Sequence, residues 1–167
     1  MDSRAQLFGH PIHQMLIVFP LGLLGGSVIF DIIHIFRGGS WSLAAWHMIG
    51  VGVITGLLAA VFGLIDWLAI PGGTRAKSVG AWHAIGNVIV LLLFAASWRI
   101  RRDDMANPET FAYVLSFAGF ALSGITAWLG GELVNRLGVG VYHDANLNAP
   151  SSLRTSSVRP DSTKARA

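Results

Sequence analysis

Apolar residues are gathered in four long runs along the chain, and polar residues gather between the runs and at the two ends. The runs cover residues 15–36, 44–70, 81–98 and 111–129. Each holds about twenty residues or more, which at about 1.5 Å per residue crosses a hydrocarbon layer about 30 Å thick. The pattern predicts an all-α, four-helix transmembrane bundle. Four crossings place both termini on the same side of the membrane.

Gly and Pro residues mark where the runs end. Arg37-Gly38-Gly39-Ser40 follows the first run and Pro71-Gly72-Gly73 follows the second. Pro11 suits the first turn of a helix, so the first helix is predicted to begin near His10–His13. After residue 143 the chain is rich in Ser, Arg, Asn, Asp and Pro, a composition that predicts disorder. The predicted parts are a leader (1–14), a four-helix transmembrane domain (15–143) and a disordered tail (144–167).

Composition agrees with a chain that faces lipid. Hydrophobic residues make up 53% and charged residues 13%, whereas soluble domains have about 25% charged residues. The chain has no cysteine, so any metal or haem must be held by His, Met, Asp or Glu. The net charge is +3. Contact of the basic tail with anionic lipid explains this charge more simply than binding of nucleic acid does. We expect a lipid bilayer as partner, no nucleic acid, and an inner-membrane location with cytoplasmic termini.

Two histidines begin the first and third predicted helices, and we expect them at a similar depth. His13 is followed by Met-Leu-Ile-Val, and His83 by Ala-Ile-Gly-Asn-Val-Ile-Val. A duplicated helical hairpin, matching Asp66-Trp67-Leu68 to Ala127-Trp128-Leu129, would place the two histidines across the central axis. Two neutral imidazoles facing one another across a bundle can ligate a b-type haem. The alternative is a pair of interfacial histidines that bond to backbone or lipid headgroups.

Other polar residues belong to the same predicted layer. His10 lies three residues from His13 and is an alternative ligand or a neighbour of the ligand. Asp66 either pairs with Arg75 and Lys77 or accepts the N–H of a ligating histidine. The predicted cofactor-binding residues are His13, His83, His10, Asp66, Asn87, Glu132 and Arg136, with His13 and His83 as metal ligands. Glu132 and Arg136 would pair with each other or with haem propionates, and a mononuclear metal held by His10, His13, His83 and Asp66 is a further alternative.

The opposite end of the predicted bundle has fewer polar residues. Asp31 and His34 are three residues apart, and His47 begins the second helix. A second haem between His34 and His47 is one interpretation. The simpler one is structural, with Asp31 accepting a hydrogen bond near the end of the first helix.

Several motifs resemble those of a bacterial family of predicted membrane proteins with a domain of unknown function. They are Gly9-His10-Pro11-Ile12-His13, Asp66, Ile70-Pro71, Thr74-Arg75-Ala76, Gly80, His83, Asn87 and Trp128-Leu129-Gly130-Gly131-Glu132-Leu133-Val134. The resemblance covers about residues 8–141, and Gln14 departs from it because relatives often carry a second proline there. Members look like distant relatives of four-helix dihaem cytochromes b, and some are fused to Rieske-type domains. The resemblance implies membrane electron transfer and favours haem at His13 and His83.

We therefore expect a small redox membrane protein with haem b bound between the first and third helices, and a redox partner protein. The alternatives are a transporter or sensor that binds a metal or proton, and a non-catalytic accessory subunit. The sequence leaves open whether the chain is an enzyme and whether it forms a homo-oligomer.

Overall fold

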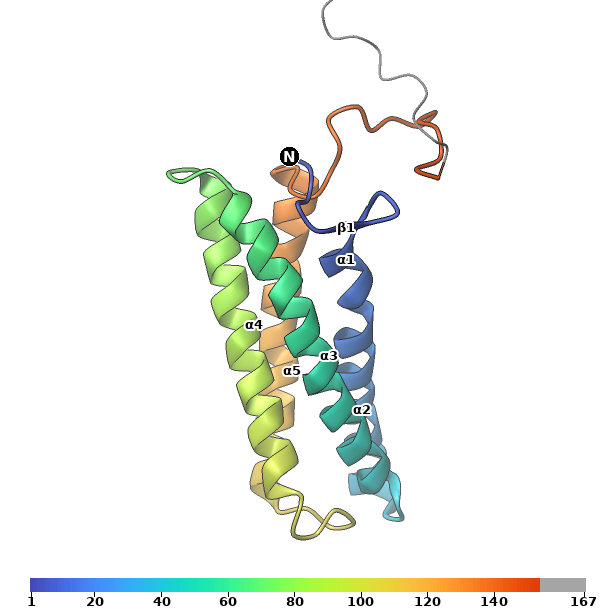
Figure 1. Ribbon diagram of the computed structural model, residues 1–167. Helices are drawn as coiled ribbons and strands as arrows, with labels where there is room; N and C mark the ends of the chain where they lie inside the picture. Colours follow the sequence, from blue (N-terminus) through green and yellow to red (C-terminus); the bar gives the residue numbers. More distant parts are fainter. Residues whose placement is uncertain (154–167) are drawn as a thin grey trace, which may run out of the picture.

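The computed structural model describes residues 1–153, and its four long helices lie side by side in one bundle (Figure 1). All four are long and apolar enough to cross a membrane. The predicted all-α, four-helix architecture is confirmed. The helices are α1 (Ile12–Leu16) continued by α2 (Val18–Arg37), then α3 (Trp41–Ala69), α4 (Arg75–Ile100) and α5 (Thr110–Gly131), the last extended by the π-helix η1 (Glu132–Arg136).

The leader and the segment after η1 lie at one end of the bundle, as the prediction of termini on the same side requires (Figure 1). We call this the termini end, and it includes the turn between α3 and α4. The turns from α2 to α3 and from α4 to α5 lie at the opposite end, which we call the loop end. Gly38, with φ of 64°, follows α2 there, and at the termini end the Thr74 hydroxyl accepts a hydrogen bond from Lys77 N at the start of α4.

The leader contains a small hairpin that the sequence did not predict. Strands β1 (Gln6–Leu7) and β2 (His10–Pro11) pair antiparallel. The two residues between them, Phe8 and Gly9, both have positive φ, as a two-residue hairpin turn requires. Helix α1 begins at Ile12, as expected. Of the predicted disordered tail, residues 154–167 lie outside the described residues.

Each half of the chain forms a helical hairpin, α2 against α3 and α4 against α5, and the two hairpins share one core. Leu24, Val28, Ile49, Val90 and Phe94 form this core. The outward-facing large apolar side chains are exposed, as expected for helices surrounded by lipid. The core therefore occupies the middle of the bundle, between the polar residues of the two ends.

The two halves make equivalent contacts. A Cβ on Gly52 would lie 2.7 Å from Leu24, and a Cβ on Gly119 would lie 2.9 Å from Phe94. Leu24 and Phe94 are 70 positions apart, and Gly52 and Gly119 are 67 apart. The predicted match of Trp67 to Trp128 uses a spacing of 61 positions, so it pairs residues that are not equivalent. The contacts of the two hairpins therefore match as a duplication predicts, in a different register for the second and fourth helices.

Candidate functional site

The imidazole rings of His13 and His83, which we call the imidazole pair, lie close together at the termini end. Their centroids are 6.5 Å apart, and the ring planes are nearly perpendicular, at 86°. His13 comes from α1 and His83 from α4, and both rings are part-buried. His13 and His83 are 70 residues apart in the sequence. They were predicted to lie near each other, and in the structure they do.

Each ring of the imidazole pair is held by a backbone carbonyl of the helix that follows it. Nδ1 of His13 lies 2.8 Å from Ala59 O on α3, and Nδ1 of His83 lies 2.9 Å from Thr126 O on α5. A carbonyl oxygen can only accept, so each Nδ1 carries the proton. In the neutral form, each ring therefore has its lone pair on Nε2, and this is the form in which histidine binds a metal.

Glycines let both rings approach the neighbouring helix. A Cβ on Gly63 would lie 2.9 Å from His13, and a Cβ on Gly130 would lie 3.1 Å from His83. Any larger residue at position 63 or 130 would clash with the neighbouring imidazole unless the ring moved. The two glycines are 67 positions apart, like the carbonyl partners Ala59 and Thr126. The duplication thus builds the same histidine environment twice.

Asn87 distinguishes the two histidines. Its Nδ2 lies 2.8 Å from His83 O and 3.2 Å from His83 Nε2, and its Oδ1 accepts a hydrogen bond from the Thr126 hydroxyl. Because the carbonyl only accepts, the amide nitrogen must face His83 and donate to its Nε2 lone pair. Asn87 was predicted to belong to this site, and it contacts one of the two imidazoles directly.

Asp66 has other partners than those predicted. Its carboxylate accepts hydrogen bonds from the Ser3 hydroxyl at 2.8 Å and from the backbone N–H groups of Arg4 and Ala5. The prediction that Asp66 orients a histidine was wrong, because backbone carbonyls already take both Nδ1 protons. Instead, Asp66 fixes the leader against the end of α3.

Glu132 and Arg136 do not pair with each other. Glu132 instead forms an ion pair with Arg75, with 3.0 Å between nitrogen and oxygen. The predicted i,i+4 pair assumed an α-helix, but residues 132–136 form the π-helix η1, whose wider turn changes which side chains are neighbours. Glu132 and Arg136 both line a shallow hollow of about 270 Å³ beside Trp128.

His10 is exposed, and its Nε2 lies 3.2 Å from the Ser152 hydroxyl, so it is not a neighbour of the imidazole pair in the described contacts. Within residues 1–153, no group of three or more His, Cys, Asp or Glu side chains could hold a metal ion. The alternative metal site built from His10, His13, His83 and Asp66 is therefore wrong for this fold.

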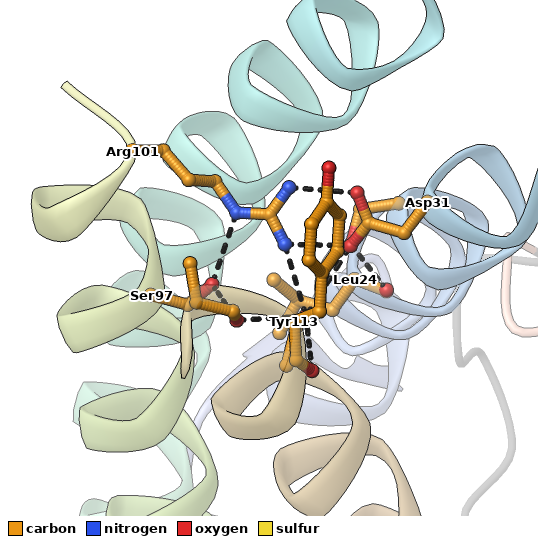
Figure 2. Close-up of polar contacts among 8 residues, drawn as sticks. Leu24, Asp31, Ser97, Arg101 and Tyr113 are labelled. Atoms are coloured by element: carbon orange, nitrogen blue, oxygen red, sulfur yellow. Dashed lines mark hydrogen bonds and ion pairs between the residues drawn. The ribbon is translucent and has the colours of Figure 1, made fainter. Parts of the chain in front are cut away.

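A buried ion pair at the loop end was missed by the sequence reasoning (Figure 2). Asp31 on α2 accepts two hydrogen bonds from the Arg101 guanidinium, at 2.7 and 2.6 Å, and both side chains are 0% exposed. Arg101 also donates to Ser97 and Ser116 and lies over the Tyr113 ring. Asp31, Arg101, Ser97 and Ser116 are called the ion-pair centre below.

The sequence did carry a signal for the ion-pair centre. Asp31 and Arg101 are 70 positions apart, the spacing that relates His13 to His83. Arg101 follows the third apolar run, and the sequence alone assigned it no partner. The expectation that Asp31 accepts a hydrogen bond near the end of the first helix is confirmed.

The second haem considered between His34 and His47 has no support in the geometry. Nδ1 of His47 bonds to Leu43 O in its own helix, and its ring is exposed against Trp46. The ring of His34 stacks instead on Tyr113, with centroids 6.5 Å apart. The two imidazoles therefore pack against different helices and partners.

Comparison with known proteins agrees with the membrane architecture. Neither a curated protein nor a solved structure matches the chain. Residues 9–143, well over half of the chain, match one family of membrane proteins. The matched segment begins beside His10 and includes the imidazole pair, the ion-pair centre and all four long helices. The chain therefore belongs to the family described as predicted membrane protein (DUF2231).

Proposed function

We propose that this protein is a small electron-transfer protein of the membrane that holds one b-type haem between His13 and His83. The observation that carries the proposal is the imidazole pair itself. Two rings from opposite halves of the bundle have their Nδ1 protons fixed by carbonyls, so both have a lone pair on Nε2, and that of His83 accepts a hydrogen bond from the Asn87 amide. Backbone carbonyls commonly orient metal-binding histidines in this way.

The spacing of the rings fits one metal ion between them. Two imidazoles bound on opposite sides of a metal, at metal–nitrogen distances of about 2.0 Å, have centroids roughly 6.3 Å apart. The observed separation is 6.5 Å. With two neutral nitrogen ligands and no thiolate in the chain, the donor set suits a haem iron with two histidines.

In this proposal His13 and His83 would hold the haem iron, and a bound haem would supply one-electron transfer. The chain's own contribution is to fix the two imidazoles, to exclude water, and to provide positive charge at the termini end for the haem carboxylates. Arg136 is the better candidate for that charge, because Arg75 is paired with Glu132. Glu132 is itself a carboxylate and would repel the propionates, so it has no role in binding them in this proposal.

The apolar core argues against the transporter alternative. Residues 13 and 31 are 18 positions apart, about 27 Å along the helices. Between these levels lie the core side chains, among them Ile49 and Phe94, which are both 0% exposed. An ion or proton path would need polar groups or water across this layer, whereas an electron does not.

The proposed location is the inner membrane, with the termini on the cytoplasmic side and a redox partner protein at the termini end. Each end of the described chain has four basic residues, and four more in the sequence after residue 153 favour cytoplasmic termini by the positive-inside rule. A reporter fused after the tail tests the orientation.

The experiment is a visible spectrum of the protein purified in mild detergent and supplied with haem. We expect a Soret band and a reduced-minus-oxidised α-band at one haem per chain, both lost in His13→Ala and in His83→Ala. His10→Ala and His47→Ala are matched controls, because each removes an exposed imidazole and should keep the bands. A folded wild-type protein that takes up no haem, or bands that survive both ligand substitutions, would refute the proposal.

A further inference from the structure

We propose that a shallow hollow beside Arg4 binds the phosphate of an anionic phospholipid, such as phosphatidylglycerol, at the termini end of the bundle. The hollow, called the Arg4 hollow below, has a volume of about 350 Å³ and is lined by Arg4, Ile65, Leu68 and Ala69. None of these residues belongs to the imidazole pair, so the inference does not depend on the proposed haem.

The walls of the Arg4 hollow place it at the surface of the membrane. Ile65, Leu68 and Ala69 belong to the last two turns of α3, a helix long and apolar enough to cross a bilayer. Ile65 is 42% exposed and Leu68 is 62% exposed. At the end of such a helix the acyl chains of the lipid meet the phosphates of the headgroups. An apolar wall beside a guanidinium therefore offers a contact to each part of a phospholipid.

The leader holds Arg4 at this place through its backbone. The N–H of Arg4 donates to Asp66 Oδ1 at 2.8 Å, and the Ser3 hydroxyl and the N–H of Ala5 donate to the same carboxylate. Arg4 is exposed, and within residues 1–153 its guanidinium forms no hydrogen bond or ion pair. A guanidinium can bind a phosphate through two parallel hydrogen bonds. The leader thus presents an available anion-binding group to the end of α3.

The other half of the chain has an equivalent hollow, the one beside Trp128 described above. Three of its residues follow three residues of the Arg4 hollow by 67 positions each, so that Glu132, Asn135 and Arg136 correspond to Ile65, Leu68 and Ala69. Position 69 has no charge, and the leader supplies Arg4 instead. A guanidinium is therefore present in both hollows, although the two arginines come from different elements. This recurrence is the observation that points to an anion.

The lining of the Arg4 hollow favours an anionic lipid over a zwitterionic one. No carboxylate is among the described residues that line it, and the nearby Asp66 already accepts from three donors. The ammonium of phosphatidylethanolamine would find no partner there, whereas phosphatidylglycerol has a negative phosphate and no ammonium. The hollow beside Trp128 differs, because Glu132 lines it and Arg136 is proposed for the haem carboxylates. The proposal is therefore made for the Arg4 hollow alone.

The test is the affinity of the full-length protein in mild detergent for phosphatidylglycerol and for phosphatidylethanolamine, measured for the first bound lipid by native mass spectrometry. We expect wild-type protein to bind phosphatidylglycerol more tightly. Arg4→Gln should lower that affinity by about fivefold or more, the effect of one basic residue close to anionic lipid. Arg99→Gln is the matched control, since Arg99 is exposed at the loop end, and it should leave the affinity unchanged.

Asp66→Asn separates a positioned site from a general attraction between charges. The substitution removes a negative charge, which by charge alone would strengthen the binding of an anionic lipid. If Asp66 positions Arg4, the loosened leader should weaken this binding instead. Circular dichroism of each variant should show the helix content of wild type.

Four results would overturn the proposal: equal affinity of wild-type protein for the two lipids, unchanged affinity in Arg4→Gln, equal losses in Arg4→Gln and Arg99→Gln, or tighter binding of phosphatidylglycerol by Asp66→Asn. Displacement of the lipid by an equal concentration of glycerol phosphate would also overturn it, because that compound has the phosphate without the acyl chains.

Discussion

Loss of one charge from the ion-pair centre should destabilise the bundle strongly. In Asp31→Asn, Arg101 keeps its charge at 0% exposure, and one of its two carboxylate hydrogen bonds, at 2.6 and 2.7 Å, is lost. A hydrogen bond to a charged group contributes about 1.5–3 kcal/mol. With the cost of a buried unpaired charge added, we expect a loss of about 3–5 kcal/mol.

The assay is unfolding in mixed detergent micelles, with the free energy of unfolding extrapolated to the native condition. Arg99→Met is the matched control, because Arg99 is exposed two positions from Arg101 and its removal should cost less than about 0.5 kcal/mol. The double variant Asp31→Leu with Arg101→Met should recover most of the stability, since a well-packed apolar pair avoids the cost of burying charges.

A charge exchange tests the geometry more directly. Asp31→Arg with Arg101→Asp puts the guanidinium where the carboxylate was, and the duplication makes the two positions equivalent. The exchanged pair should be more stable than either single charge reversal. It should stay about 1 kcal/mol below wild type, because the residue equivalent to Ser116 in the first half is Ile49, which cannot hydrogen-bond to the guanidinium. If Asp31→Asn costs no more than Arg99→Met, the pair is not the buried centre described above.

Three further predictions concern the termini end. Gly63→Ala should push the His13 ring away from the Ala59 carbonyl and so lower haem uptake, measured as the Soret absorbance per chain. Haem uptake equal to that of wild type would contradict the close contact between Gly63 and the His13 ring. Asp66→Asn should loosen the leader, because the Ser3 hydroxyl and two backbone N–H groups bond to the carboxylate, and hydrogen exchange at Arg4 and Ala5 should rise at least several-fold. Glu132→Gln should change the unfolding free energy by less than about 1 kcal/mol, since Arg75 is 62% exposed and surface pairs contribute little.

The helices were predictable because a segment that crosses the lipid bilayer must be apolar along its whole length, and this is visible in a single sequence. A run of about twenty apolar residues has few structural alternatives. The imidazole pair was predictable for a related reason, since polar side chains near the ends of such helices are few and their depths can be counted along the chain.

Partner choice was harder to predict, because hydrogen bonds depend on how the helices rotate and pack. Asp66 was assigned to basic neighbours in sequence, yet the leader folds back and supplies its donors. Glu132 was assigned to Arg136, but the π-helix changes the turn on which that spacing depends. Arg101 was assigned no partner, because burial of a guanidinium can be predicted only when its carboxylate partner is known to face it.

The position of the ion-pair centre has a consequence for how such a chain could arise. Two identical hairpins associated about a two-fold axis place like residues opposite one another, so they could bring two imidazoles together. At positions 31 and 101, however, the same symmetry would set carboxylate against carboxylate or guanidinium against guanidinium, and like charges buried together repel. Attraction across the axis requires two different residues at symmetry-related places. Two hairpins of different sequence can encode that arrangement, and the covalent link between them ensures that every bundle contains one hairpin of each kind, so that its loop end is held by opposite charges.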